Sequence, residues 1–166
     1  MEDIAAQAGL SPATLYLYFA NKQAIVTAIN ELLFTAELDG FQQLQVAPGT
    51  ARERILLMVD AIAVEMEQQS ATMAIFYEFF AMGLRQPSAR QVLQAFLRET
   101  QAALAALVQE GMARGEFRPT ETSQVAAAIA AMIEGTLLLW GYDPEQVQLR
   151  PQIALGVELL LDGLRP

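Results

Sequence analysis

Hydrophobic positions recur at helical spacing along nearly the whole chain. Apolar residues return every three or four positions within each segment, and Pro and Gly fall between the segments rather than inside them. No run of β-branched and aromatic residues alternates with polar residues between hairpin turns. The pattern therefore predicts an all-α fold. The expected helices span about residues 1–8, 12–19, 22–45, 51 to beyond 66, 70–84, 89–113, 123–140 and 151–164.

Several expected helix ends carry residues that favour a helix terminus. Gly9 follows the first helix, where glycine adopts a left-handed backbone conformation without steric cost. Ser11 and Asn21 precede the second and third helices, and their side chains can accept a hydrogen bond from a free backbone N–H. Thr50 and Glu53 have the spacing of a capping box, so a further helix is expected to begin directly after Thr50.

The first two expected helices are short and flank a glycine-containing turn, as in a helix-turn-helix unit. Leu15 and Phe19 share one face of the second helix and should pack on Ile4. In such a unit the second helix enters the major groove of DNA. Its outer residues and the next helix start offer small side chains, hydroxyl groups and one ammonium group to DNA: Pro12, Ala13, Thr14, Tyr16, Leu17, Tyr18 and Lys22. Without further information, the two helices could be any helical hairpin.

The composition excludes most enzyme chemistry. The chain has no Cys and no His, so disulfides, thiolate or imidazole zinc sites and the Ser-His-Asp and Cys-His nucleophile systems are impossible. No pair of carboxylates stands in a recognisable catalytic frame, and no Gly-rich loop for phosphate is present. We expect a protein that is not an enzyme and holds no cofactor or metal. A helical-bundle enzyme without metal is the weakest of the alternatives.

The residues of the short helices resemble the signature of the tetracycline-repressor (TetR) family, in stretches 3–5, 8–11, 14–19 and 21–22. The rest of the chain is similar to the family in helix lengths. The resemblance implies an all-α protein with a helix-turn-helix head at 1–47 and a ligand-binding and dimerisation body at 48–166. It also implies that Pro12, Ala13 and Leu17 face the groove, and that phosphates are contacted by Thr14, Tyr16, Tyr18 and Lys22. The implied function is transcriptional regulation through operator DNA, with repression relieved by a small apolar effector.

One departure from the family pattern concerns the head. Family members have another helix, with basic residues ahead of it, before the position where this chain begins, so we expect the head to be incomplete. Residues 1–47 contain one Lys against five Asp and Glu, and the whole chain carries a net charge of −9. Because non-specific DNA affinity depends on neutralising phosphates, we expect weak DNA binding by this chain alone. The alternative function is a ligand-binding or interaction dimer that does not bind DNA.

Aromatic and Met residues of the middle helices could line an apolar pocket, or could be ordinary core. The candidates are Phe34, Met58, Ile62, Phe76, Phe80 and Phe96. Glu134 lies inside an apolar stretch, and a buried carboxylate needs a partner. That partner could be a cationic or hydroxylated ligand or a neighbouring Arg, unless Glu134 points to solvent.

The last two expected helices are apolar on more than one face, which predicts a homodimer. A helix that is apolar all round must be buried all round, and a second copy can cover the free face with the same two helices. The expected interface residues are Ile129, Ile133, Leu137, Trp140, Val157, Leu160, Leu161 and Leu164. The apolar stretch 125–142 carries Glu134 and lacks a positive flank, so a membrane partner is not expected. With no export signal and no Cys, a cytoplasmic location is expected.

Overall fold

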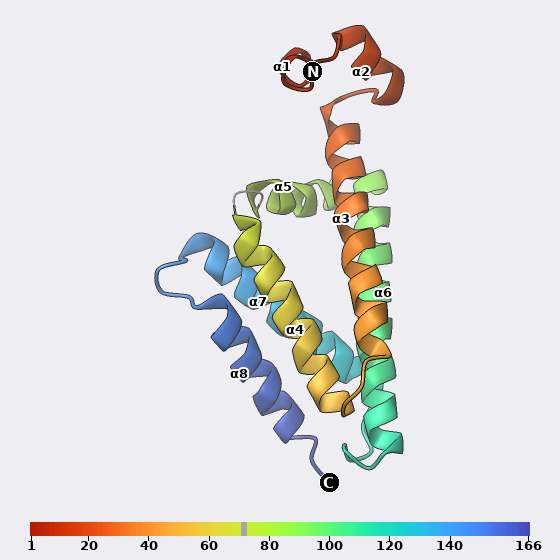
Figure 1. Ribbon diagram of the computed structural model, residues 1–166, viewed down its shortest axis with the longest axis vertical. Coiled ribbons are helices and arrows are strands. Elements are labelled where there is room, and N and C mark those ends of the chain that lie inside the picture. Colours follow the sequence, from red (N-terminus) through yellow and green to blue (C-terminus); the bar gives the residue numbers. More distant parts are fainter. Residues whose placement is uncertain (71–72) are drawn as a thin grey trace.

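The computed structural model describes residues 1–70 and 73–166, and within them the fold is all-α without a strand (Figure 1). The prediction of an all-α fold is therefore confirmed. The expected helix at 70–84 is described from Met73 onward, so residues 71 and 72 of that prediction lie outside the described residues. The helices are α1 (Glu2–Gln7), α2 (Pro12–Tyr18), α3 (Lys22–Gln45), α4 (Ala51–Gln68), α5 (Met73–Gly83), α6 (Pro87–Ala113), α7 (Thr122–Tyr142) and α8 (Leu149–Asp162).

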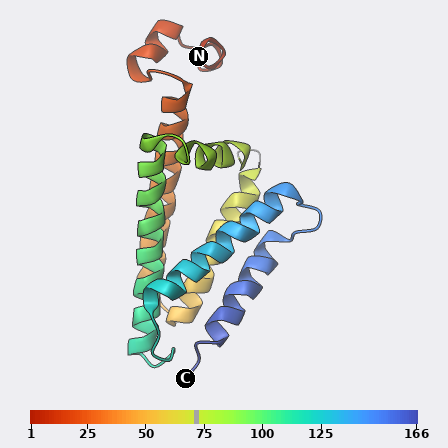
Figure 2. The same cartoon turned by 180° about the vertical axis from the view of Figure 1, so that it is seen from behind.

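The molecule is elongated, and its two parts are joined by α3. The short helices α1 and α2 lie at one end of α3, apart from the other helices (Figure 1). Along most of its length α3 lies beside α6, while α5 crosses near the upper ends of both (Figures 1 and 2). The helices α4, α7 and α8 complete the body, and the C-terminus lies at the end of the molecule opposite the N-terminus.

The helix ends form as their residues predict. Gly9 has φ of +67° at the end of α1. The Ser11 hydroxyl accepts a hydrogen bond from the Thr14 N–H, and the Asn21 side chain accepts one from the Ala24 N–H. Thr50 and Glu53 exchange the two hydrogen bonds of a capping box, at 3.1 and 2.8 Å. Two helices begin two residues before the predicted position, α6 at Pro87 and α8 at Leu149. For α6 the reason is that proline fits the first turn of a helix, where its missing N–H is not needed.

The apolar core consists of two clusters. The larger joins α4, α6, α7 and α8 around side chains that are fully enclosed, such as Ile55, Leu104 and Ile153. The smaller joins α3, α5 and α6 near the head, with Phe79 at its centre. Burial of such side chains contributes about 1.5–3 kcal/mol each, so the two clusters hold the helices of the body together.

Arg54 holds the end of α3 that is farthest from the head. Its side chain is 3% exposed and donates hydrogen bonds to the backbone carbonyls of Gln45 and Thr50, while its guanidinium forms an ion pair with Glu110 of α6. Gln45 in turn donates to the carbonyl of Ala103 at 3.0 Å. The C-terminal end of α3 is therefore bound to both α4 and α6.

Six of the eight expected dimer residues lie in the core of the single chain, so for these six the expected position at a free surface was wrong. Ile129, Ile133, Leu137, Val157, Leu161 and Leu164 are all buried, and Trp140 and Leu160 are half-buried against the same cluster. The error has a physical reason: α7 and α8 are apolar on both faces, and the named residues occupy the inward one. The outward face exposes Leu138, Leu139, Tyr142, Leu155 and Leu159.

Among the described residues, α7 is the one helix long and apolar enough to cross a membrane by length and composition. This is weak evidence, because core helices of soluble proteins pass the same test. In the structure α7 packs against α6 and α8.

Candidate functional site

The outward side of α2 presents most of the residues that were expected to contact DNA. Leu15 is buried and Phe19 half-buried, whereas Tyr16, Leu17 and Tyr18 are exposed by 54%, 82% and 77%. Pro12, Ala13 and Lys22 are exposed as well. Thr14 differs, because it is half-buried and its hydroxyl lies 2.8 Å from that of Ser11. The geometry brings these side chains together on one end of the molecule, as the helix-turn-helix interpretation requires.

Two adjoining cavities lie inside the body, and we call them together the chamber. The first has a volume of about 60 Å³ and the second about 20 Å³, so they hold a few water molecules at most. Glu37, Met66 and Phe76 line both cavities. The first is lined in addition by Ile29, Asn30, Leu33, Phe34, Glu65, Gln69, Met73 and Ile75, and the second by Ile62, Phe96, Leu97, Thr100, Ala130, Ile133, Glu134 and Leu137. The chamber thus lies between the two core clusters and contacts five helices.

Three carboxylates from three helices line the chamber: Glu37 of α3, Glu65 of α4 and Glu134 of α7. Burial, followed by the neighbouring charges of Glu65 and Glu134, raises the pKa of Glu37 to about 8. Burial also raises the pKa of Glu134 to about 7. None of the described residues that line the chamber is Lys or Arg. The carboxylates therefore lack a protein cation that would stabilise their charged form.

Other polar groups around the chamber lack partners as well. The hydroxyls of Thr100 and Tyr77 are buried without a hydrogen-bond partner. Among the described residues, no hydrogen-bond donor is paired with the carboxylate of Glu37 or Glu134, whereas the side-chain amide of Gln69 donates to Glu65 at 3.0 Å. Burial, followed by the charge of Glu134 and then Tyr142, raises the pKa of Tyr77 to about 12. A buried polar group left unpaired costs about 1–3 kcal/mol, so a ligand with hydrogen-bond donors or a positive charge would find partners here.

The structure places only some of the pocket residues expected from the sequence at the chamber. Phe34, Ile62, Phe76, Phe96 and Glu134 line the chamber. Met58 and Phe80 do not line it: Met58 is enclosed in the larger core cluster, and Phe80 packs beside Phe76 in the smaller one, with ring centroids 4.7 Å apart. The sequence analysis missed Glu37, Glu65 and Thr100. A weak signal existed for Glu37, which follows Phe34 by three residues and precedes Phe41 by four, at helical spacing.

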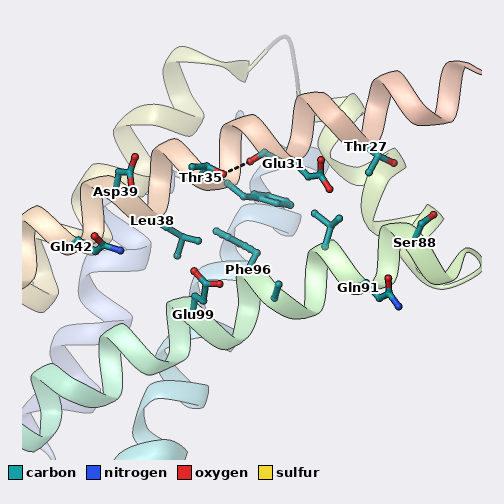
Figure 3. Close-up of a pocket in the computed structure, with 13 residues that line it drawn as sticks. Thr27, Glu31, Thr35, Leu38, Asp39, Gln42, Ser88, Gln91, Phe96 and Glu99 are labelled. Atoms are coloured by element: carbon teal, nitrogen blue, oxygen red, sulfur yellow. Dashed lines mark hydrogen bonds between the residues drawn. The ribbon is translucent and has the colours of Figure 1, made fainter. Parts of the chain in front are cut away.

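An open groove of about 730 Å³ runs along the seam between α3 and α6, on the solvent side of the chamber (Figure 3). Three carboxylates stand along it, Glu31 and Asp39 from α3 and Glu99 from α6. Its apolar floor includes Phe34 and Phe96, whose rings stack with centroids 4.1 Å apart at an interplanar angle of 15°. The other lining residues are Thr27, Thr35, Leu38, Gln42, Ser88, Gln91, Val92 and Ala95.

Family models match both parts of the chain. Residues 1–29 match the model described as bacterial regulatory proteins, tetR family. Residues 51–165 match the model described as BetI-type transcriptional repressor, C-terminal. Together the two matched ranges include the helix-turn-helix unit and nearly the whole body, with most of α3 between them.

Individual relatives give the same picture. The HTH-type transcriptional regulator BetI of Rhizobium meliloti (strain 1021) is 26% identical, over 99% of this chain and 79% of its own length. A TetR transcription regulator from Haloarcula marismortui superimposes with a TM-score of 0.86 at 15% identity, covering 97% of this chain and 84% of the other. The transcriptional regulator FadR from Bacillus subtilis, solved in complex with stearoyl-CoA, gives 0.75 at 23% identity, covering 98% and 87%. The two structural matches establish a shared fold.

Proposed function

The chain belongs to the tetR family of bacterial transcriptional regulators, and we propose that it acts as a repressor that leaves its operator when a small molecule occupies the chamber. The family consists of regulators rather than enzymes. The observation that carries the proposal is the chamber itself, where the desolvated carboxylates of Glu37 and Glu134 face no protein cation and Glu37 lies on the helix that bears the head. Repression is supported by the description of the family model that matches the body. A regulator of this kind works in the cytoplasm, where its operator lies.

The head supports an assignment of roles to individual residues. Small or exposed side chains at the start and middle of α2 would read base edges, and these are Pro12, Ala13 and Leu17. Hydroxyl and ammonium groups would contact phosphates, through Thr14, Tyr16, Tyr18 and Lys22. Accordingly, Tyr16→Phe or Lys22→Ala should weaken binding to all operator sequences, whereas Leu17→Ala should change the preferred sequence.

The chamber narrows the chemistry of the effector. Its aromatic and aliphatic lining suits an apolar molecule, as the resemblance implies, but the desolvated carboxylates of Glu37 and Glu134 are costly to keep beside such a molecule alone. We propose an effector with an apolar body and a positively charged or hydrogen-bond-donating group. The solved relative FadR is bound to stearoyl-CoA, so the bodies of such regulators can hold an organic molecule. The effector of this chain would bind by enlarging the chamber.

A homodimer would place two heads on one operator. The outward faces of α7 and α8, with Leu139, Tyr142, Leu155 and Leu159, form the apolar surface that a second copy would cover. Ala131 and Gly135 of α7 are also exposed, and such small residues would let the helix backbones of the two copies approach closely. Two heads then contact half-sites about one helical turn of DNA apart, or a multiple of it.

Selection of genomic DNA fragments on the purified protein, followed by footprinting at physiological salt, tests DNA binding. A protected palindromic site whose occupancy falls when an amine binds supports the proposal. A second candidate function is a ligand-binding dimer without DNA activity, which the net charge of −4 on residues 1–47 favours. No protected site at any salt concentration, with ligand binding intact, would establish that second candidate instead.

A further inference from the structure

The stacked rings of Phe34 and Phe96 separate the outer groove from the chamber. Phe34 lines both the groove and the first cavity, and Phe96 lines both the groove and the second cavity. Both side chains are largely buried, at 4% and 6% exposure. The two rings therefore line the groove on one side and the chamber on the other.

We propose that ligands reach the chamber through the seam between α3 and α6, where Phe34 and Phe96 form a gate, and that the acidic groove outside admits positively charged molecules. The proposal rests on the proposed function, because it takes the chamber to be the ligand site. It adds to that function the path by which ligands enter the chamber, the residues that close this path and the charge of the ligands that pass along it.

The packing on two other sides of the chamber favours this route. On the side of α4, α7 and α8, the chamber adjoins the larger core cluster, in which Met58, Ile129 and Val157 are at most 1% exposed. At the far end, Arg54 joins α3 to α4 and α6. At the seam, the stacked rings of Phe34 and Phe96 line both the chamber and a groove of about 730 Å³. Stacking of two aromatic rings contributes about 0.5–1.5 kcal/mol beyond area burial, so opening the gate costs this amount together with the apolar area that the rings expose.

The charges along this route have one sign. Glu31, Asp39 and Glu99 stand in the groove, and three more carboxylates line the chamber behind the gate. None of the described residues that line either space is Lys or Arg. A cleft lined by one charge concentrates the opposite ions and raises their association rate by about 10–1,000-fold. An organic cation is attracted at the groove and again in the chamber, whereas an anion is repelled at both.

A matched pair of probes tests the charge selection: 4-fluorobenzylammonium, and its neutral analogue of the same size, 4-fluorobenzyl alcohol. Fluorine NMR exchange measurements give the dissociation constant and both rate constants for each probe. We expect the ammonium probe to bind at least tenfold more tightly than the alcohol at pH 8, with a preference that Glu37→Gln reduces. Equal affinities, or no binding of the ammonium probe, would overturn the selection of cations.

The groove charges are tested by the triple variant Glu31→Gln, Asp39→Asn, Glu99→Gln. Association of the ammonium probe should slow by at least fivefold at low salt and lose most of its salt dependence, while its dissociation rate and the kinetics of the alcohol stay unchanged. The matched control removes three exposed charges from elsewhere, with Glu121→Gln, Glu145→Gln and Glu158→Gln. An equal slowing in both triple variants would contradict guidance by the groove.

The route is tested by blocking it. Since the chain contains no Cys, Ala95→Cys places a single thiol in the groove, where pyrene maleimide attaches a bulky group. A blocked route slows association and dissociation together by at least tenfold and leaves the dissociation constant within twofold. The same label at exposed Gln94→Cys, the neighbouring position that does not line the groove, is the control.

Other results of the blocking experiment have distinct meanings. Unchanged rates after labelling Ala95→Cys would place the route elsewhere and leave the chamber as the ligand site. Weaker binding without slower dissociation would make the groove itself the ligand site. If neither the label nor Glu37→Gln changes the affinity or the rates, the chamber is not the ligand site, and the proposed function is contradicted as well.

Discussion

Arg54 and Glu110 form an ion pair between α4 and α6, with Nη2 and Oε1 2.5 Å apart, and the guanidinium is almost fully buried while the carboxylate is one-third exposed. The pair lowers the pKa of Glu110, chiefly through the hydrogen bond from Arg54. At the same point Arg54 donates to the carbonyl of Gln45, so one side chain connects three helices.

We expect Arg54→Ala to lower the free energy of unfolding by about 3 kcal/mol, because it removes a buried cation together with its backbone hydrogen bonds. The control is Arg52→Ala on the same helix, which breaks a partly exposed ion pair with Asp162 and should cost less than about 1 kcal/mol. Urea unfolding of both variants measures the difference. Equal effects would mean that the burial of Arg54 has no energetic consequence.

The raised pKa of Glu37 predicts that the protein loses stability as the pH rises. Its pKa is about 8 in the folded chain and about 4.5 when unfolded, so the unfolded state releases the proton first and is favoured between those values. As far as this group is concerned, the free energy of unfolding should therefore be highest below pH 4.5 and should fall until about pH 8. Each pKa unit corresponds to about 1.4 kcal/mol. Glu37→Gln should stabilise the protein by a few kcal/mol at pH 8.5 and have little effect at pH 5. Thermal unfolding at both pH values measures this, with exposed Glu31→Gln as the control on the same helix.

Binding of a cation should depend on pH in the opposite direction. A positive charge in the chamber favours the ionised carboxylates, whose pKa values are about 7 for Glu134 and about 8 for Glu37. We expect the affinity for 4-fluorobenzylammonium to rise from pH 6 to pH 8.5, and calorimetry to detect proton release. The alcohol probe should show no such rise. A flat pH profile for the ammonium probe would mean that these carboxylates do not contact it.

The exposed apolar face of α7 and α8 predicts how to separate two copies of the chain. Replacing Leu139 and Leu155 by Glu should yield a folded monomer in sedimentation experiments, because both side chains are exposed in the single chain. Leu137→Glu should instead unfold the body, since Leu137 is 2% exposed and belongs to the larger core cluster. A dimer that survives the first double variant would place the interface on another surface.

Local features of this fold could be predicted from the sequence, and relations between helices could not. The caps at Ser11, Asn21 and Thr50 depend on residues three positions apart, so their spacing is visible in the chain itself. The inward side of α7 is different: apolar residues occupy both faces, and only packing against α6 and α8 decides that Leu137 is buried and Leu138 is not.

The candidate site was predictable to a similar extent. Glu134 stood out because its neighbours in sequence are apolar. Glu37 and Glu65 have polar residues close by in sequence, so nothing in the chain shows that they meet Glu134 in one chamber. Phe76 and Phe80, four residues apart on α5, look alike in sequence, yet only Phe76 reaches the chamber.

The attachment of α3 at one end makes it a lever. Its fulcrum is the fixed C-terminal end at Gln45, and at 1.5 Å per residue the gate residue Phe34 lies about 16 Å from that point, with Lys22 about 35 Å from it. A rigid rotation that opens the seam by 1 Å at Phe34 would therefore move the head by about 2 Å. The ratio of head movement to seam opening depends on the position of the ring stack along α3. A gate nearer Gln45 would give a larger movement of the head for the same opening, and one nearer Lys22 would give a movement hardly larger than the opening itself.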